Sequence, residues 1–279
     1  MTTSRQKKQR AQDADRPPIW VGYGKLTKLH RERAGLTQQE LASAVGYSYE
    51  QVASIEQGRR PAKSAFTDAA EEVLNAGGTL AVLQDDVDLA KLPAFFQDFA
   101  LIETEAISRY DFEPLLIPGL LQTEDYARAL FSSNSPLMSE ETIEQHVEAR
   151  LGRQKLLTKT PLVETSFIIG EHALLGMAGS ADVRRAQLQH ILRQGSTRSI
   201  EIQIMPSEPG FHLGLNGAMV IMETLEHRQV GYIESQGAGF VITDPKQVSG
   251  FAVRYGKLRS QALNVKESAR LIERMAGEA

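Results

Sequence analysis

The stretch Leu36–Arg60, LTQQELASAVGYSYEQVASIEQGRR, decides the fold of the first part of the chain. It holds two patterns of the form S/T-x-x-E/Q, which start at Thr37 and Ser48 and are typical of the first residues of a helix. Gly46 ends the first helix, because glycine readily takes the left-handed conformation of a helix stop. Only about three residues then separate the two helices, so the second must cross the first steeply. The spacing therefore predicts a helix-turn-helix, whose second helix can enter the major groove of DNA.

Helical periodicity assigns the side chains of this segment to two faces. The inward face, which holds the two helices together, consists of Leu41, Val45, Val52 and Ile55. The outer row at the start of the second helix consists of Tyr49, Glu50, Gln51 and Ser54. The Gln51 amide can bond adenine through two hydrogen bonds, and the Glu50 carboxylate can accept one from a cytosine amine. Tyr49 can touch a thymine methyl group or a phosphate. We therefore expect this row to contact DNA.

Residues on either side of the row are suited to the DNA backbone. Gln38 begins the first helix, where its side chain and the helix dipole can both meet a phosphate. Three basic residues just past the second helix are expected to clamp phosphates: Arg59, Arg60 and Lys63. Residues 1–63 hold twelve Lys and Arg against six acids, although the whole chain has a net charge of −4. A basic N-terminal segment favours a polyanionic partner. The competing interpretation, a plain bundle of well-capped helices, leaves the polar row and the basic flank unexplained.

The same segment resembles a known family. It is similar to the Xre (phage-repressor-like) helix-turn-helix regulators over about residues 22–76, through Thr37–Ala42 (TQQELA), Val45-Gly46 and Ile55–Pro61 (IEQGRRP). The resemblance implies a five-helix DNA-binding domain that works as a dimer on a pseudo-palindromic operator. It also implies a partly buried ion pair between Arg31 and Glu56, which would tie the first helix to the end of the recognition helix. By residue type alone, the two could equally be solvated charges.

The rest of the chain has a resemblance of its own, over about residues 93–275. It is similar to a large class of actinobacterial regulators, typified by Streptomyces, that attach an antitoxin-like domain to an Xre head. The similarity is carried by Pro118–Thr123 (PGLLQT), Tyr126–Ala129 (YARA), Arg150, Arg153-Gln154, Gln187-Leu188, Met205-Pro206 and Tyr232–Glu234 (YIE). The resemblance implies control of development or antibiotic production, and pairing with a small protein encoded by an adjacent gene. It implies no role for individual residues.

We expect three parts: a basic disordered tail (1–20), an all-α helix-turn-helix domain (21–92) and an α+β regulatory and dimerisation domain (93–279). The last is predicted to be mainly helical with a small β-sheet, so that the chain as a whole is α+β. Its helices are expected at Phe95–Ser108, Asp125–Phe131, Ser139–Leu157, Ala181–Gln194, Pro245–Ala262 and from Asn264 onward. Its strands are expected at Leu162–Ile169, Ser199–Met205, Gly217–Glu223, Gln229–Glu234 and Phe240–Ile242. In the first domain, the pattern of Thr79–Leu92 predicts a fifth helix or a surface turn.

The composition argues against several classes of protein. The sequence has no cysteine, which excludes disulfides, thiolate metal sites and a cysteine nucleophile. It has no glycine-rich phosphate loop and no GxSxG elbow. No HExxH or other metal pair is formed by the six histidines, His30, His146, His172, His190, His212 and His227. We therefore expect neither an enzyme nor a cofactor nor a metal. No apolar run approaches the roughly 18–20 residues of a membrane span, and no signal peptide is present, so the expected location is cytoplasmic and nucleoid-associated.

Two features of the second domain leave alternatives open. Arg150, Arg153 and Lys155 share a predicted helix with several glutamates, and such a charge run is a solvated face or an anchor for a protein partner. The strands of residues 211–234 belong to the core, or they line a small-molecule pocket with Met219, Met222 and Tyr232. Taken together, the sequence predicts a homodimeric repressor or autoregulator that binds a double-stranded DNA operator and is controlled by a small protein partner. The alternative is a ligand-gated transcription factor.

Overall fold

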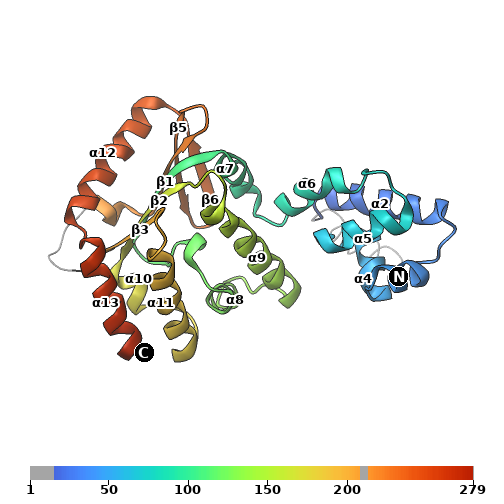
Figure 1. The fold of residues 1–279 in the computed structure, drawn as a ribbon, viewed down its shortest axis with the longest axis horizontal. Helices are drawn as coiled ribbons and strands as arrows, with labels where there is room; N and C mark the ends of the chain where they lie inside the picture. The colour runs from blue at the N-terminus through green and yellow to red at the C-terminus, as the bar shows by residue number, and fades with distance from the viewer. Residues whose placement is uncertain (1–15, 208–212, 279) are drawn as a thin grey trace, which may run out of the picture. The chain divides into compact units, whose positions relative to one another are not determined.

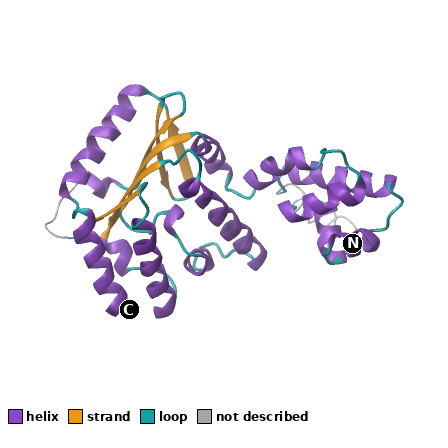
Figure 2. Cartoon of the chain, in the orientation of Figure 1, coloured by secondary structure: helices purple, strands orange, loops and turns teal. Residues whose placement is uncertain are grey.

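The computed structural model describes residues 16–207 and 213–278, which belong to two compact units, Met1–Pro93 and Ala94–Ala279. Figure 2 draws strands only in the second unit of the described chain. Most of the expected basic tail, residues 1–15, lies outside the described residues. The last part of that expected tail is helical, because helix α2 (Pro18–Arg33) begins with proline in its first turn and buries Trp20. Proline suits this position, since its missing N–H would have no partner there.

The N-terminal unit is built from helices around one apolar core. They are α2, α3 (Gln38–Val45), α4 (Tyr49–Glu56), α5 (Ser64–Leu74), the 3-10 turn η1 (Ala81–Leu83) and α6 (Gln84–Leu89). Segment 79–92 is thus a 3-10 turn followed by a short helix. The core is formed by residues of every helix, among them Tyr23, Leu41, Val52, Phe66 and Val87. The Trp20 indole N–H donates to the Val87 carbonyl over 3.0 Å and so joins α2 to α6.

The C-terminal unit contains a mixed six-stranded sheet in the order β3-β2-β1-β4-β5-β6. Its strands are β1 (Ala106–Glu113), β2 (Glu164–Gly170), β3 (Ile200–Met205), β4 (Met219–Thr224), β5 (Gln229–Ser235) and β6 (Ala238–Ile242). The first three pair in parallel, and β4, β5 and β6 add antiparallel neighbours beside β1. The expected α+β class is therefore confirmed, whereas the sheet is larger than the small one that we expected.

Helices cover both faces of this sheet (Figure 1). On one face α12 (Pro245–Gln261) buries Val248, Tyr255 and Leu258 against β1, β2 and β4. On the other face lies a larger core, in which α11 and α13 pack side by side. The elements on this second face are α7 (Ala94–Thr104), η2 (Gly119–Leu121), α8 (Glu124–Ser132), α9 (Glu140–Arg153), η3 (Gln154–Thr158), α10 (Glu171–Leu175), α11 (Ala181–Gly195) and α13 (Val265–Glu278). None of the described helices has the length and apolar character needed to cross a membrane.

Two expected helices end earlier than the sequence indicated. The helix expected at Phe95–Ser108 ends at Thr104, and the chain continues into β1, the strand next to the centre of the sheet. This strand was missed because Arg109 and Asp111 occupy inward positions and break the apolar alternation of a strand. The helix expected at Ser139–Leu157 ends at Arg153 and continues as the 3-10 turn η3.

Close packing of α2 against α4 depends on a glycine. A Cβ atom at Gly24 would lie 2.3 Å from the Ile55 carbonyl oxygen, whereas a Cβ at Gly22 would meet nothing within 4 Å. Gly24→Ala should therefore lower the free energy of unfolding of the N-terminal unit by roughly 1–3 kcal/mol, as overpacking does. Trp20 is the only tryptophan of the chain, so its fluorescence during urea unfolding reports on this unit alone.

The matched control is Gly22→Ala on the same helix. Alanine has the higher helix propensity, and this variant should gain roughly 0.5–1 kcal/mol. Equal effects of the two substitutions would show that Gly24 is not a packing requirement.

Candidate nucleic-acid interface

Helices α3 and α4 form a helix-turn-helix in which each helix begins with a complete capping box. The Thr37 hydroxyl accepts from the Glu40 backbone N–H, and the Glu40 carboxylate accepts from the Thr37 backbone N–H. Ser48 and Gln51 make the same reciprocal pair at α4. Gly46 ends α3 with φ +74°, in the left-handed region. The two expected capping boxes and the glycine stop are confirmed.

A buried ion pair connects three helices of this unit. Arg31 of α2 donates from Nε to Glu56 Oε1 over 2.6 Å and from Nη2 to Oε2 over 3.0 Å. The same guanidinium donates to the Leu36 carbonyl over 2.8 Å, at the entry to α3. Gln38 of α3 donates its amide to Glu56 Oε2 over 2.7 Å. The Arg31 and Glu56 side chains are 9% and 1% exposed. Hydrogen bonding to Glu56 raises the pKa of Arg31.

The outer row of α4 lies at the surface, with its conformation fixed from within the helix. Tyr49 is 45% exposed, Glu50 is exposed, and Gln51 and Ser54 are half-buried. The Glu50 carboxylate accepts hydrogen bonds from the Glu50 backbone N–H and from the Ser48 hydroxyl, and these bonds lower the pKa of Glu50. The Gln51 carbonyl oxygen accepts from the Ser48 N–H, so its capping bond leaves the amide donors available. Recognition of bases by these four residues stays a prediction.

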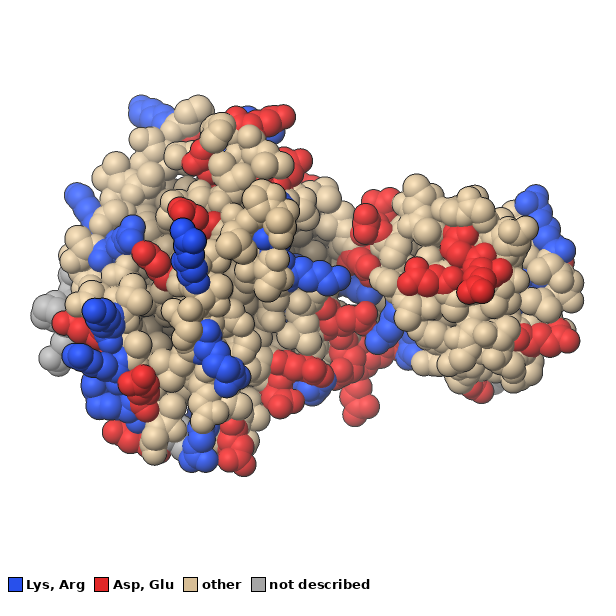
Figure 3. Space-filling view, in the orientation of Figure 1, with Lys and Arg blue, Asp and Glu red and all other residues tan. Residues whose placement is uncertain are grey.

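The side chains expected to meet phosphates differ in their surroundings. Arg59 and Lys63 are exposed and Arg60 is half-buried, in the segment between α4 and α5. The Gln38 side chain is held by Glu56, and its contact with a phosphate stays a prediction. Acidic side chains gather on the part of the unit drawn over α5 and α6 in Figure 3. Those two helices carry Asp68, Glu71, Glu72, Asp85, Asp86 and Asp88, which makes their surface unsuited to a polyanion.

A second polar cluster lies inside the C-terminal unit, and sequence reasoning missed it. Arg109 of β1 pairs with Asp111 two residues along the same strand, over 2.7 and 2.8 Å, and with Glu103 of α7. Glu103 also receives two hydrogen bonds from Arg153 of α9, each of 2.7 Å. The Arg153 guanidinium lies over the Phe96 ring, 4.3 Å from its centroid. The two arginines neutralise the two carboxylates, so the cluster is buried with its charges paired.

Arg150 of α9 also points inward. It donates to the Gln122 side-chain carbonyl over 2.8 Å and lies over the Phe131 ring. Burial and the nearby Arg153 lower the pKa of Arg150 to about 10. Gln187 of α11 bonds the Leu121 carbonyl and the Thr123 N–H, on the same loop. The expectation that Arg150 and Arg153 lie on a solvated face or anchor a partner is therefore wrong. These side chains hold the 118–123 loop and α7 in place.

The last acidic residue of β1, Glu113, has an unusual pKa. Burial, together with the carboxylates of Asp111 and Glu234, raises the pKa of Glu113 to about 8. The side chain is therefore largely protonated at neutral pH, because a charged form would be poorly solvated and repelled by its neighbours.

The described residues contain no group of three or more histidine, cysteine or acidic side chains that could hold a metal ion. Burial and the nearby Arg193 lower the pKa of His190. His227 bonds Glu223, and His30 bonds Thr79, so these two rings already have partners. His212 lies outside the described residues.

Comparison with protein families gives a match for each unit. Residues 24–83 match the model of a helix-turn-helix domain, and residues 96–274 match that of a domain of unknown function, DUF5753. No curated protein and no solved structure matches the chain. The helix-turn-helix match supports a DNA-binding regulator and points to a regulator more than to an enzyme.

Glu56→Gln should lower the free energy of unfolding of the N-terminal unit by roughly 3–5 kcal/mol, because it leaves the buried Arg31 guanidinium with only the exposed Glu32 carboxylate as an opposite charge. Urea unfolding followed by Trp20 fluorescence measures the loss. The control is Glu32→Gln: this exposed carboxylate lies 3.9 Å from Arg31 and should contribute less than about 1 kcal/mol. If both variants lose the same small amount, the pair with Glu56 has no structural importance.

Glu113→Gln should stabilise the C-terminal unit, and by more as the pH rises. A carboxyl whose pKa is raised by folding does not destabilise the folded state below pH 4.5, the pKa in the unfolded chain. Above that pH it lowers the free energy of unfolding, by an amount that grows until the pH reaches about 8. Glutamine keeps the neutral form at every pH. At pH 8 we expect a gain of roughly 1–3 kcal/mol, which shrinks towards pH 5.

Calorimetry can follow the unfolding transition that Trp20 fluorescence does not report. Glu164→Gln, at an exposed position of β2, is the control and should show no such pH dependence. A gain for Glu113→Gln that is equal at pH 5 and pH 8 would contradict the raised pKa.

Proposed function

The chain belongs to the family defined by the domain of unknown function DUF5753, and we propose that it is an Xre-type, sequence-specific transcriptional regulator of the kind found in Streptomyces. The observation that carries the proposal is the surface of α4. Its first turn presents an aromatic, a carboxylate and an amide side chain in one row, the exposed Tyr49 and Glu50 and the half-buried Gln51. The basic residues Arg59 and Lys63 follow directly and are exposed. A recognition helix needs this combination of base-reading and phosphate-binding groups.

Hydrogen bonds at both ends hold α4 in place, and this supports direct readout of DNA bases. Ser48, Gln51 and Glu50 fix the first turn of the helix by hydrogen bonds within it. Glu56 fixes the last turn through Arg31 and Gln38. Side chains whose helix is held at both ends lose little further conformational freedom on binding, so more of the contact energy goes into affinity and specificity. We assign base contacts to Tyr49, Glu50, Gln51 and Ser54, and phosphate contacts to Gln38, Arg59, Arg60 and Lys63.

The proposed regulator is a homodimer on a two-fold related operator, and it acts as a repressor or autoregulator. Strand β6 is a suitable dimerisation surface, because it forms one of the two outer edges of the sheet. Its five residues, AGFVI, include no charge and no proline, the features with which proteins usually protect an edge strand from pairing. Phe240 at its centre is 61% exposed and pairs with Ile233, 36% exposed, on β5. Two copies of β6 can pair antiparallel about a two-fold axis.

The proposed signal is a small protein encoded by an adjacent gene, as the resemblance to the antitoxin-like regulators implies. Binding of such a partner to the folded chain alone would raise its melting temperature, because the added stability grows with the logarithm of one plus the ratio of the partner's concentration to its Kd. The second candidate, control by a small molecule, is favoured by one observation, a small hollow between α12 and the sheet.

Arg59→Gln should weaken binding to every DNA sequence and reduce the dependence on salt. Each lost phosphate contact lowers the slope of log K against log salt concentration by about 0.9. Fluorescence anisotropy with a labelled duplex at four or more salt concentrations gives the slope. The control is Arg270→Gln, which removes an exposed arginine from α13 and should leave the slope unchanged. An unchanged slope for Arg59→Gln would remove this arginine from the DNA interface.

Phe240→Lys should dissociate the dimer, because a lysine on an edge strand opposes strand pairing. Sedimentation equilibrium at micromolar concentration measures the mass. The control is Leu175→Lys, at a leucine of α10 that is also 61% exposed, and it should remain dimeric. A Phe240→Lys protein that stays dimeric would place the dimer interface elsewhere.

A further inference from the structure

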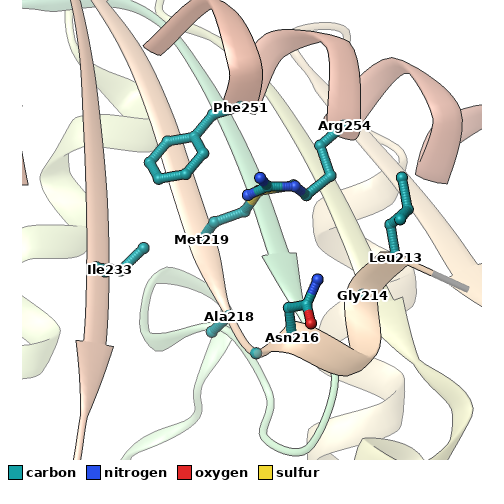
Figure 4. Close-up of a pocket in the computed structure, with 9 residues that line it drawn as sticks. Leu213, Gly214, Asn216, Ala218, Met219, Ile233, Phe251 and Arg254 are labelled. Atoms are coloured by element: carbon teal, nitrogen blue, oxygen red, sulfur yellow. The ribbon is translucent and has the colours of Figure 1, made fainter. Parts of the chain in front are cut away.

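A small hollow lies between α12 and the sheet, next to the 3-10 turn η4 (Leu213–Asn216) (Figure 4). Its cavity volume is about 140 Å³, which is below the usual range for ligand pockets, so it suits only a small ligand. Its walls are mostly apolar: Leu213, Ala218, Met219, Ile233 and Phe251. Of the three side chains that the sequence analysis placed around a pocket, Met219 lines this hollow. Tyr232 and Met222 lie in the core on the opposite face of the sheet.

Among the described residues, Arg254 is the only charged one that lines the hollow. In Figure 4 its guanidinium points inward from α12 and lies between the Phe251 ring and the Asn216 amide. The guanidinium carbon is 5.2 Å from the centroid of the Phe251 ring. No carboxylate among the described residues pairs with Arg254. The hollow therefore combines apolar walls with a half-buried cation that no described carboxylate neutralises.

The donors in the hollow suit one kind of anion. A guanidinium binds a carboxylate through two parallel hydrogen bonds, and the Asn216 amide can add a third. A doubly charged phosphate would require further cations, and the described residues that line the hollow include no lysine and no second arginine. The remaining walls can contact only an apolar body, and Met219 can adapt to its shape because its side chain is unbranched and flexible.

We propose that this hollow binds a small monocarboxylate with a short aliphatic or aromatic body. The carboxylate pairs with Arg254, and the body packs against Met219, Ile233 and Phe251. The site is separate from α4, and the proposal does not depend on the DNA-binding function, since binding is measured on the protein without DNA.

The test is an NMR titration of the full chain, labelled with ¹³C at the methionine methyl groups, with sodium hexanoate. The Met219 methyl resonance should shift and saturate, and the resonance of Met222 on the opposite face should not move. Hexanamide has nearly the same shape without the charge, and it should bind at least about tenfold more weakly, because it cannot form the charge-assisted pair.

Two variants separate the proposal from nonspecific binding. Arg254→Gln should weaken hexanoate binding about tenfold or more, and Ala218→Leu should abolish it by filling the hollow. The control is Arg259→Gln: this residue lies on the same helix, pairs with Glu201 at the surface and does not line the hollow. The proposal is overturned if hexanoate leaves the Met219 resonance unchanged, if hexanamide binds equally well, or if Arg254→Gln binds like the unmodified protein.

Discussion

The bond between Arg31 and Glu56 is the contact on which the N-terminal unit depends. Glu56 closes the last turn of α4, Arg31 comes from α2, and Gln38 comes from the first turn of α3. One buried carboxylate therefore fixes the relative position of the three helices that build the helix-turn-helix. Apolar packing supplies most of the stability of such a unit, but it is nondirectional. A two-bond ion pair adds direction, because it tolerates little rotation of α4 about its axis.

The C-terminal unit also contains buried ion pairs, which here connect helices to a strand of the sheet. Arg109 lies on a strand in the middle of the sheet, and its charge is balanced by Asp111 and Glu103. Arg153 completes the cluster from α9. Replacing such a group by apolar residues is often neutral or stabilising, so the cluster is weak evidence for stability. What the cluster does is align α7 and α9 over β1, and Arg150 and Gln187 then hold the loop that carries the PGLLQT segment.

Local signals predicted much of this structure. The capping boxes, Gly46 and the inward apolar residues of α3 and α4 lie within a few residues of each other, and the helix-turn-helix followed from them. Five of the six strands were also expected, since their apolar runs are short and bounded by turns. The strand β1 was not, because Arg109 and Asp111 look like surface residues until Glu103 and Arg153 are placed beside them. Arg153 lies 50 residues from Glu103, and Arg150 lies 28 from Gln122. No local pattern reveals such pairs.

At the candidate interface, too, local features could be predicted from the sequence and contacts between distant residues could not. Sequence periodicity predicted which side chains of α4 face outward, and the family resemblance implied the pair between Arg31 and Glu56. The sequence did not show that the Gln38 amide donates to Glu56, or that Gln51 uses its side-chain carbonyl oxygen to cap α4. The second point decides how base readout is best tested. Alanine at position 51 would remove the capping box together with the amide, whereas glutamate keeps the cap, replaces the amide donors by an acceptor and adds one negative charge.

The most direct test of the account is therefore a binding selection from random duplex DNA with the unmodified protein and with Gln51→Glu. For the unmodified protein we predict an enriched, two-fold related motif whose half-sites lie about one helical turn apart. For Gln51→Glu we predict a motif of the same spacing in which one base of each half-site has changed, because glutamate can accept from cytosine but cannot donate to adenine N7. Enrichment of no motif by the unmodified protein, or of an identical motif by both proteins, would contradict the claim that α4 reads the DNA sequence.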